Sequence, residues 1–318
     1  MKQKTQFKGV LMLCLTALIW GSAFVAQSVG MESVESFTFG GIRTLLGALV
    51  LVPFILIRDR ASAKKMSSEE LAFRKKTDKK TLKYGVILGI VFCIATNFQQ
   101  FAFTFPEASP GKIAFITAMY MFFVPLLGLI FLKKRVSLLT WLCVVLGFVG
   151  LYFLCVTPGD IASVGMGDIL TFICAVFFAV HILMVEKFAP DVDGVKLSCV
   201  QFLVSGIITS VLMFIFEDPQ ISAIKSAILP ILYSGIMSCG VAYTFQIIGQ
   251  KYTEATLASI IMCTESVFAV LTGALILSDI PSARELIGCV IMFSAIVVSE
   301  LSGTIMEKFR KSQLKKAE

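Results

Sequence analysis

The chain has 318 residues, of which 57% are hydrophobic and only 15% are charged, and its formal net charge is +7. Soluble proteins carry about a quarter charged residues, so this composition excludes a soluble globular protein and is typical of a chain that lies in a bilayer. The basic residues are spread over separate loops, which argues against a nucleic-acid-binding surface.

Apolar stretches of membrane-spanning length follow one another along almost the whole chain. A helix needs about 20 apolar residues to cross the hydrocarbon core, and each stretch is close to that length. We predict an all-α integral membrane protein whose ten transmembrane helices cover residues 9–28, 37–57, 84–103, 112–132, 136–155, 169–186, 197–216, 229–249, 255–277 and 286–303.

The connections between these stretches alternate between basic and nearly base-free. The longest polar segment, residues 58–83, is predicted to be a loop on the basic side. Because basic loops remain in the cytoplasm, the alternation predicts cytoplasmic N- and C-termini and a basic cytoplasmic tail at residues 304–318. The pattern favours a multi-pass protein of the plasma membrane, in particular a bacterial inner membrane.

The two halves of the chain resemble each other weakly. Shifted by 158 residues, Arg43 meets Gln201, and shifted by 147 residues, Gln99 meets Gln246. These matches predict one membrane domain, residues 1–318, that consists of a first five-helix repeat at residues 9–155 and a second five-helix repeat at residues 167–303.

An odd number of helices in each repeat has a geometric consequence. After five crossings the chain starts its second repeat from the opposite face of the membrane, so the two repeats are predicted to be inverted relative to each other. Inverted repeats are a common build of secondary transporters, which bind their substrate near the midplane between the repeats.

Short sequence motifs lie in several of the predicted helices. Residues 18–24 contain Trp20-Gly21, and Arg43 lies inside the second predicted helix. Residues 108–117 lie at the start of the fourth predicted helix, and residues 258–279, which contain Glu265-Ser266, cover most of the ninth. Together they resemble the drug/metabolite transporter superfamily, EamA type, over residues 9–303. The chain departs from that pattern at Ser266, where the family usually has a proline. The resemblance implies ten helices in two halves and secondary transport of small organic solutes.

Polar and aromatic side chains inside the predicted helices are the candidates for a binding site. A charged side chain at the centre of a span costs about 2.5–3.5 kcal/mol, and such groups usually face the bundle interior or a wet cavity. The predicted substrate-binding residues are Trp20, Arg43, Asn97, Gln100, Tyr120, His181, Tyr243, Gln246 and Glu265.

Three of these candidates are titratable or charged. Glu265 is predicted to couple transport to protons or to hold a substrate ammonium, and His181, the single histidine, is a second candidate for proton coupling. Arg43 suits a substrate carboxylate, which it would bind in bidentate fashion. The alternative for each is structural: a hydrogen-bonded packing residue for Glu265 and His181, and a fixed ion pair or carbonyl contact for Arg43.

The expected function is that of a secondary active transporter, an exporter of small polar organic solutes such as amino acids or metabolites, which works by alternating access. A multidrug or organic-cation exporter is the alternative, followed by a channel, a scaffold or an intramembrane enzyme. The chain contains no HExxH motif and no phosphate-binding loop, so we expect no enzyme, no catalytic residues, no metal and no cofactor. The expected partners are a small-molecule substrate and the lipid bilayer, and the protein is a monomer or a homodimer.

Overall fold

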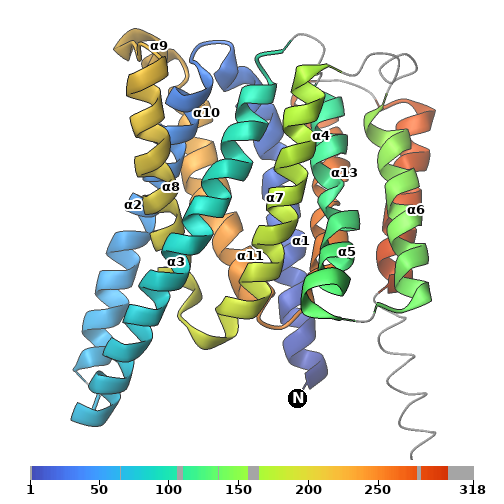
Figure 1. The fold of residues 1–318 in the computed structure, drawn as a ribbon. Coiled ribbons are helices and arrows are strands. Elements are labelled where there is room, and N and C mark those ends of the chain that lie inside the picture. Colours follow the sequence, from blue (N-terminus) through green and yellow to red (C-terminus); the bar gives the residue numbers. More distant parts are fainter. Residues whose placement is uncertain are drawn as a thin grey trace, which may run out of the picture.

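The computed structural model describes residues 2–64, 66–105, 110–134, 136–156, 165–277 and 281–299, so the predicted tail at 304–318 lies outside the described residues. The described residues are helical and contain no strand, which confirms the predicted all-α class (Figure 1). The helices are α1 (Lys2–Met31), α2 (Ser36–Ala63), α3 (Ser68–Ala102), α4 (Pro110–Ala118), α5 (Tyr120–Leu132), α6 (Leu138–Cys155), α7 (Met166–Phe188), η2 (Ala189–Asp191), α8 (Gly194–Phe216), α9 (Ile221–Ser226), α10 (Ile228–Tyr233), η3 (Ser234–Tyr243), α11 (Thr244–Gly249), α12 (Ala255–Met262), α13 (Glu265–Leu277) and a last helix at 283–299.

Within the described residues, eight helical segments are long and apolar enough to cross a membrane. The shorter apolar helix Leu138–Leu154 and the helix at 283–299 lie beside each other in Figure 1. Large apolar side chains point outward from the bundle, such as Phe131 at 74% exposure and Leu275 at 83%. Because lipid is the solvent in which such side chains are stable, the bundle surface is that of a membrane protein. The number of ten crossings stays a prediction.

The segment at 58–83 is not the loop that its polarity suggested. Helix α2 continues to Ala63, and α3 begins at Ser68 with a capping box in which Ser67 Oγ accepts from the Glu70 amide at 3.2 Å and Glu70 Oε2 accepts from the Ser67 amide at 2.7 Å. Apolar length marks the part of a helix that lies in hydrocarbon, whereas the capping residues mark where the helix begins. The prediction therefore missed two polar helical extensions, which project beyond the other helices in Figure 1.

We call the end of the bundle with the start of α1 and the α2–α3, α5–α6 and α7–α8 connections the basic end (Figure 1). Ion pairs join its helices: Lys196 of α8 lies 2.7 Å from both Asp59 of α2 and Asp78 of α3. Arg58 of α2 lies 2.7 Å from Asp193, which also accepts from the first amides of α8. Each partly exposed pair contributes at most about 1 kcal/mol to the stability of the fold. The main effect of these pairs is therefore to fix the positions of α2, α3 and α8 relative to one another.

Glu186 of α7 makes a second junction at the basic end. Its carboxylate accepts from Lys134, just after α5, and at 3.0 Å from the Ala255 amide at the start of α12. Nearby, the Lys251 ammonium donates to the Val192 carbonyl at 2.6 Å, and burial lowers the pKa of this amine. One carboxylate thus holds α5, α7 and α12 together.

At the opposite end of the bundle, Glu217 caps a helix that is far away in the sequence. Its carboxylate follows α8 and accepts from the Phe37 and Thr38 amides at 2.7 and 2.6 Å, and from Thr38 Oγ1 at 2.7 Å. The first amides of a helix lack intrahelical partners and carry partial positive charge, so an anion is stabilising there. Glu217 therefore anchors the start of α2 to the end of α8.

Candidate functional site

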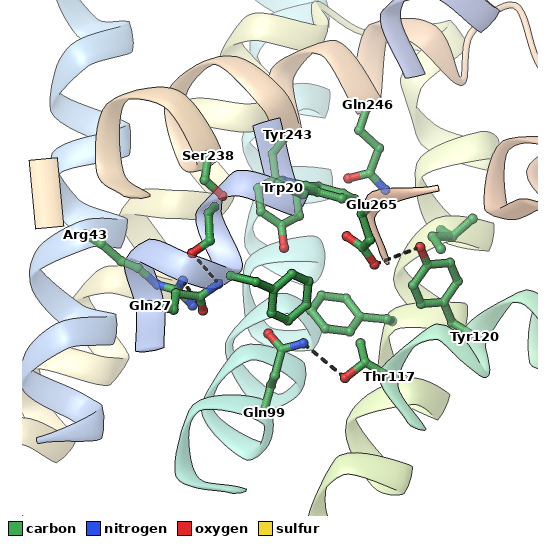
Figure 2. A pocket seen from close by; sticks show the side chains of 14 residues that line it. Trp20, Gln27, Arg43, Gln99, Thr117, Tyr120, Ser238, Tyr243, Gln246 and Glu265 are labelled. Atoms are coloured by element: carbon green, nitrogen blue, oxygen red, sulfur yellow. Dashed lines mark hydrogen bonds between the residues drawn. The ribbon is translucent and has the colours of Figure 1, made fainter. Parts of the chain in front are cut away.

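A cavity of about 40 Å³ lies inside the bundle, between helices from both halves of the chain (Figure 2). A water molecule occupies roughly 10–15 Å³ by the same measure, so the cavity holds about three waters. Polar and aromatic side chains line it, and most of them are buried. The lining residues are Trp20, Ala23, Phe24, Gln27, Arg43, Gln99, Thr117, Tyr120, Phe178, Ile182, Ser238, Tyr243, Gln246 and Glu265.

Irregular backbone surrounds this cavity on one side. The helical segment Ile228–Gly249 passes through a π-helical stretch, η3, that contains Ser238. A break at Met119 separates α4 from α5, and a second break separates Met262, the end of α12, from Glu265, the start of α13. In a membrane, such interruptions are tolerated only where protein or a water-filled cavity can satisfy the freed backbone groups, and π-turns often mark functional sites.

Arg43 enters the cavity from α2. Its side chain is 5% exposed, and its Nη1 donates to Gln27 Oε1 of α1 at 2.7 Å. Its guanidinium carbon also lies 5.5 Å from the centre of the Phe39 ring. No carboxylate lies within ion-pairing distance of Arg43 among the described residues. Arg43 is therefore a buried cation held by a neutral amide, which leaves its charge uncompensated by the protein.

Glu265 enters the cavity from the first turn of α13, on the side opposite Arg43 (Figure 2). It is 5% exposed, and its Oε1 accepts from the Tyr120 hydroxyl at 3.3 Å. Among the described residues it has no basic partner within ion-pairing distance. The cavity thus has a cationic group at one side and an acid at the other, with no protein ion pair to satisfy either.

Aromatic rings and a hydrogen-bonded glutamine–threonine pair form the walls between Arg43 and Glu265. The Trp20 and Tyr243 rings lie 4.4 Å apart, and Gln99 Nε2 donates to Thr117 Oγ1 at 3.1 Å. Trp20 Nε1, Arg43 Nε and Gln246 Oε1 are buried atoms with no hydrogen-bond partner in the described part of the chain. Buried polar atoms in native proteins are nearly always bonded, so these atoms are free to bind a solute or water that enters the cavity.

Several lining residues are separated by the offsets of the predicted repeat. Trp20 and Phe178 are 158 positions apart, and so are Phe24 and Ile182. Gln99 and Gln246 are 147 positions apart, the second offset found in the sequence. Matched positions of the two halves therefore converge on one cavity.

The structure brings six of the nine predicted binding residues into the cavity lining and leaves three outside it. Asn97 lies against α8, where its Nδ2 donates to Thr209 Oγ1 at 2.8 Å. His181 is fully buried between helices, with Nε2 3.0 Å from Gln201 Oε1 and the Phe92 ring 5.7 Å away. Gln100 is buried, but its side chain does not line the cavity. The six that do line it are Trp20, Arg43, Tyr120, Tyr243, Gln246 and Glu265.

The prediction also missed polar residues that do line the cavity, namely Gln27, Gln99, Thr117 and Ser238. Asn97 and Gln100 share one face of their helix and are the predicted binding residues, whereas Gln99, on another face, lines the cavity. The repeat offset carried the necessary signal, because Gln99 matches Gln246, which was predicted. Among the described residues, no group of three histidine, cysteine, aspartate or glutamate side chains lies close enough together to hold a metal ion.

Comparison with known proteins is consistent with this architecture. An uncharacterized transporter of Archaeoglobus fulgidus is 26% identical over 289 residues, which cover 91% of this chain and 84% of that protein. An uncharacterized transporter of Clostridium kluyveri is 22% identical over 96% of both chains, and the uncharacterized transporter YoaV of Bacillus subtilis is 21% identical over 92% of this chain and 96% of that protein.

A protein of known crystal structure superposes with a TM-score of 0.74 at 18% sequence identity, over 94% of this chain and 98% of that one, which shows a shared fold. The model of the EamA-like transporter family matches residues 7–156 and 165–301. These ranges include most of the chain and confirm the resemblance in the sequence motifs. The chain therefore belongs to the EamA-like transporter family of the drug/metabolite transporter superfamily.

Proposed function

We propose that this chain is a secondary active transporter that exports small zwitterionic solutes, such as amino acids, by alternating access between two inverted five-helix halves. One observation carries the proposal: Arg43 and Glu265 face one buried cavity from opposite sides, and neither has an ion-pair partner among the described residues. A solute with a carboxylate and an ammonium supplies the missing charge to both.

Each lining group has a defined part in this arrangement. Arg43 binds the solute carboxylate through the donors that Gln27 leaves free, since a guanidinium and a carboxylate form two parallel charge-assisted hydrogen bonds. Glu265, oriented by the Tyr120 hydroxyl, accepts from the solute ammonium. The tilted rings of Trp20 and Tyr243 form the apolar wall for the solute side chain.

The size of the cavity supports a cycle of closing and opening. At about 40 Å³ it is well below the roughly 300–1,000 Å³ of typical small-molecule sites. A solute can therefore enter only when the surrounding helices separate. The lining comes from both halves, and the two family-matched ranges coincide with the predicted repeats, so rocking of one half against the other enlarges the cavity.

We assign proton coupling to Glu265. A carboxyl group that binds an ammonium when ionised can take up a proton when the solute leaves, so the acid never stays charged in an empty cavity. His181, the other predicted coupling residue, is separated from the cavity by its packing against Gln201 and Phe92, so a role there would be indirect. We place the protein in the plasma membrane, with both termini and the basic end in the cytoplasm.

Export of organic cations is a second candidate function. It is favoured by the closeness of the Glu265 carboxylate to the aromatic pair Trp20–Tyr243 in one lining, because aromatic faces attract cations. The two candidate functions differ in the role of Arg43. Its guanidinium binds the carboxylate of a zwitterion but repels an organic cation.

Counterflow in proteoliposomes tests the proposal and separates the candidates. Purified protein is reconstituted with radiolabelled amino acids or organic cations, and uptake is compared for Arg43→Gln, Glu265→Gln and wild type. The matched controls are Lys225→Gln and Glu254→Gln, which remove the same charges from exposed positions outside the cavity.

Hydrogen bonds to charged groups contribute about 1.5–3 kcal/mol, so we expect Arg43→Gln to weaken amino-acid binding about tenfold to hundredfold. Glu265→Gln should abolish the acceleration of transport by a pH gradient, and both controls should behave as wild type. Normal amino-acid affinity in Arg43→Gln, with intact fold, would remove the zwitterion proposal, and retained transport of cations alone would favour the second candidate.

A further inference from the structure

A second hollow lies at the basic end, on the outer surface between α2, α3 and α8. Its volume is about 300 Å³, and it is separate from the central cavity because the two share no residue. We call it the lateral groove. Its lining consists of Val52, Ile55, Leu56, Asp78, Thr81, Leu82, Lys196, Cys199 and Val200.

The lateral groove changes from apolar to charged along its length. Six of its nine lining residues are apolar, and those of α2 lie in the last turns of the predicted span at 37–57. Asp78, Thr81 and Lys196 lie just outside the predicted spans at 84–103 and 197–216. The groove therefore crosses the level at which hydrocarbon gives way to lipid headgroups.

An exposed lysine continues the α3 wall of the groove beyond this level. Lys75 precedes Leu82 by seven residues, which places it about 10.5 Å further along the helix axis. Seven residues are nearly two full turns, so Lys75 lies on the same side of α3 as Leu82. Lys75 is in no ion pair with another described residue.

The other charges at the mouth of the groove neutralise one another. Lys196 lies 2.7 Å from both Asp59 and Asp78, and Arg74 pairs with the same two carboxylates. Arg58 lies 3.6 Å from Asp59 and is balanced by Asp193 at 2.7 Å, so three cations and three anions leave no net charge in this cluster. The unpaired positive charge on the α3 wall is therefore that of Lys75.

We propose that the lateral groove is a binding site for one anionic phospholipid. An acyl chain lies against the apolar walls, and the phosphate lies at Lys75, because a lysine near an anionic headgroup contributes favourably. Helices α2 and α3 belong to the first half and α8 to the second, so this lipid bridges the two halves. The proposal is independent of the transported solute.

Native mass spectrometry of the full chain in a nonionic detergent tests the site. The protein is titrated with phosphatidylglycerol and, separately, with phosphatidylcholine of the same chain length. The variant Lys75→Gln is compared with Lys76→Gln, an adjacent exposed lysine that a helix places about 100° away. We expect Lys75→Gln to weaken phosphatidylglycerol binding about fivefold and Lys76→Gln by less than twofold, with phosphatidylcholine unaffected.

A second pair of variants tests the groove itself. Leu56→Trp fills the hollow, whereas Phe54→Trp alters an exposed position outside its lining. Leu56→Trp should lower phosphatidylglycerol binding at an unchanged melting temperature, and Phe54→Trp should leave the binding unchanged. Soluble glycerol phosphate at millimolar concentration should not displace the lipid. Equal losses in Lys75→Gln and Lys76→Gln, no preference over phosphatidylcholine, or displacement by glycerol phosphate would each overturn the proposal.

Discussion

Gly21 is the position at which a single added methyl group should stop transport. It follows Trp20 in α1, where α1 packs directly against α13. A Cβ atom at Gly21 would lie 2.5 Å from the Glu265 carbonyl oxygen, 2.7 Å from the Ala269 amide nitrogen and 2.7 Å from Phe268 Cβ. None of these atoms belongs to the flexible end of a side chain, so the two helices must move apart to accept alanine.

The size of the effect follows from these contacts. Non-bonded carbon atoms are stable at about 3.5–4.0 Å, so α13 must shift by about 1 Å at the residue that carries the Glu265 carboxyl group. Overpacking of this kind costs about 1–3 kcal/mol, and the better helix propensity of alanine returns at most about 1 kcal/mol. We expect Gly21→Ala to be destabilised by about 1–2 kcal/mol and to lose most of its solute affinity.

Two measurements check this expectation: thermal unfolding in detergent and solute counterflow in liposomes. Gly128→Ala is the matched control, because its added Cβ would meet only Leu183 Cδ2 at an ordinary 3.7 Å. The control should be as stable as wild type or slightly more stable, and fully active. If Gly21→Ala is as stable and active as Gly128→Ala, the close α1–α13 contact does not position Glu265, and the reasoning is refuted.

Two further changes test the Glu217 cap at one end of the bundle and the Arg43–Gln27 contact in the cavity. Glu217→Gln removes the charge that caps α2 and should lower the free energy of unfolding by about 1–2 kcal/mol, which is measured as a lower melting temperature. The control Asp218→Asn should melt as wild type. Equal melting temperatures of the two variants would contradict the capping role. Gln27→Glu places a carboxylate beside Arg43 and should reduce affinity for carboxylate solutes in a thermal-shift titration without lowering stability; unchanged affinity would mean that Arg43 does not bind the solute.

The sequence alone predicts the helical class, the family and the most strongly constrained side chains. Arg43 and Glu265 stand out because a charge in an apolar helix has few stable positions, and both line the cavity. Gln99 could also be found, through its repeat partner Gln246. His181 shows the limit, because an isolated histidine in an apolar helix has the same pattern whether it faces a cavity or packs against Gln201.

Other features depend on contacts that composition does not encode. The interruption at Met119 lies inside an apolar run, and the one before Glu265 lies inside a single stretch of membrane-spanning length, so hydropathy predicts one unbroken helix in each place. The helical extensions at 58–63 and 68–83 are polar, and their polarity wrongly predicts a loop, because hydropathy reports the solvent around a helix rather than its hydrogen bonds. The Ser67–Glu70 capping box is the local signal that marks the start of α3, and the prediction did not use it.

The cap that Glu217 provides for α2 also sets a condition on how the protein is made. The capped Phe37 amide is separated from Glu217 by 180 residues, which a ribosome adds in roughly ten to thirty-five seconds at 5–20 residues per second. During that interval the first amides of α2 lack this carboxylate and must bond to water instead. This junction is complete only when α8 has been synthesised and packs against α2. The first half of the polypeptide therefore reaches its final structure only after the second half has been made.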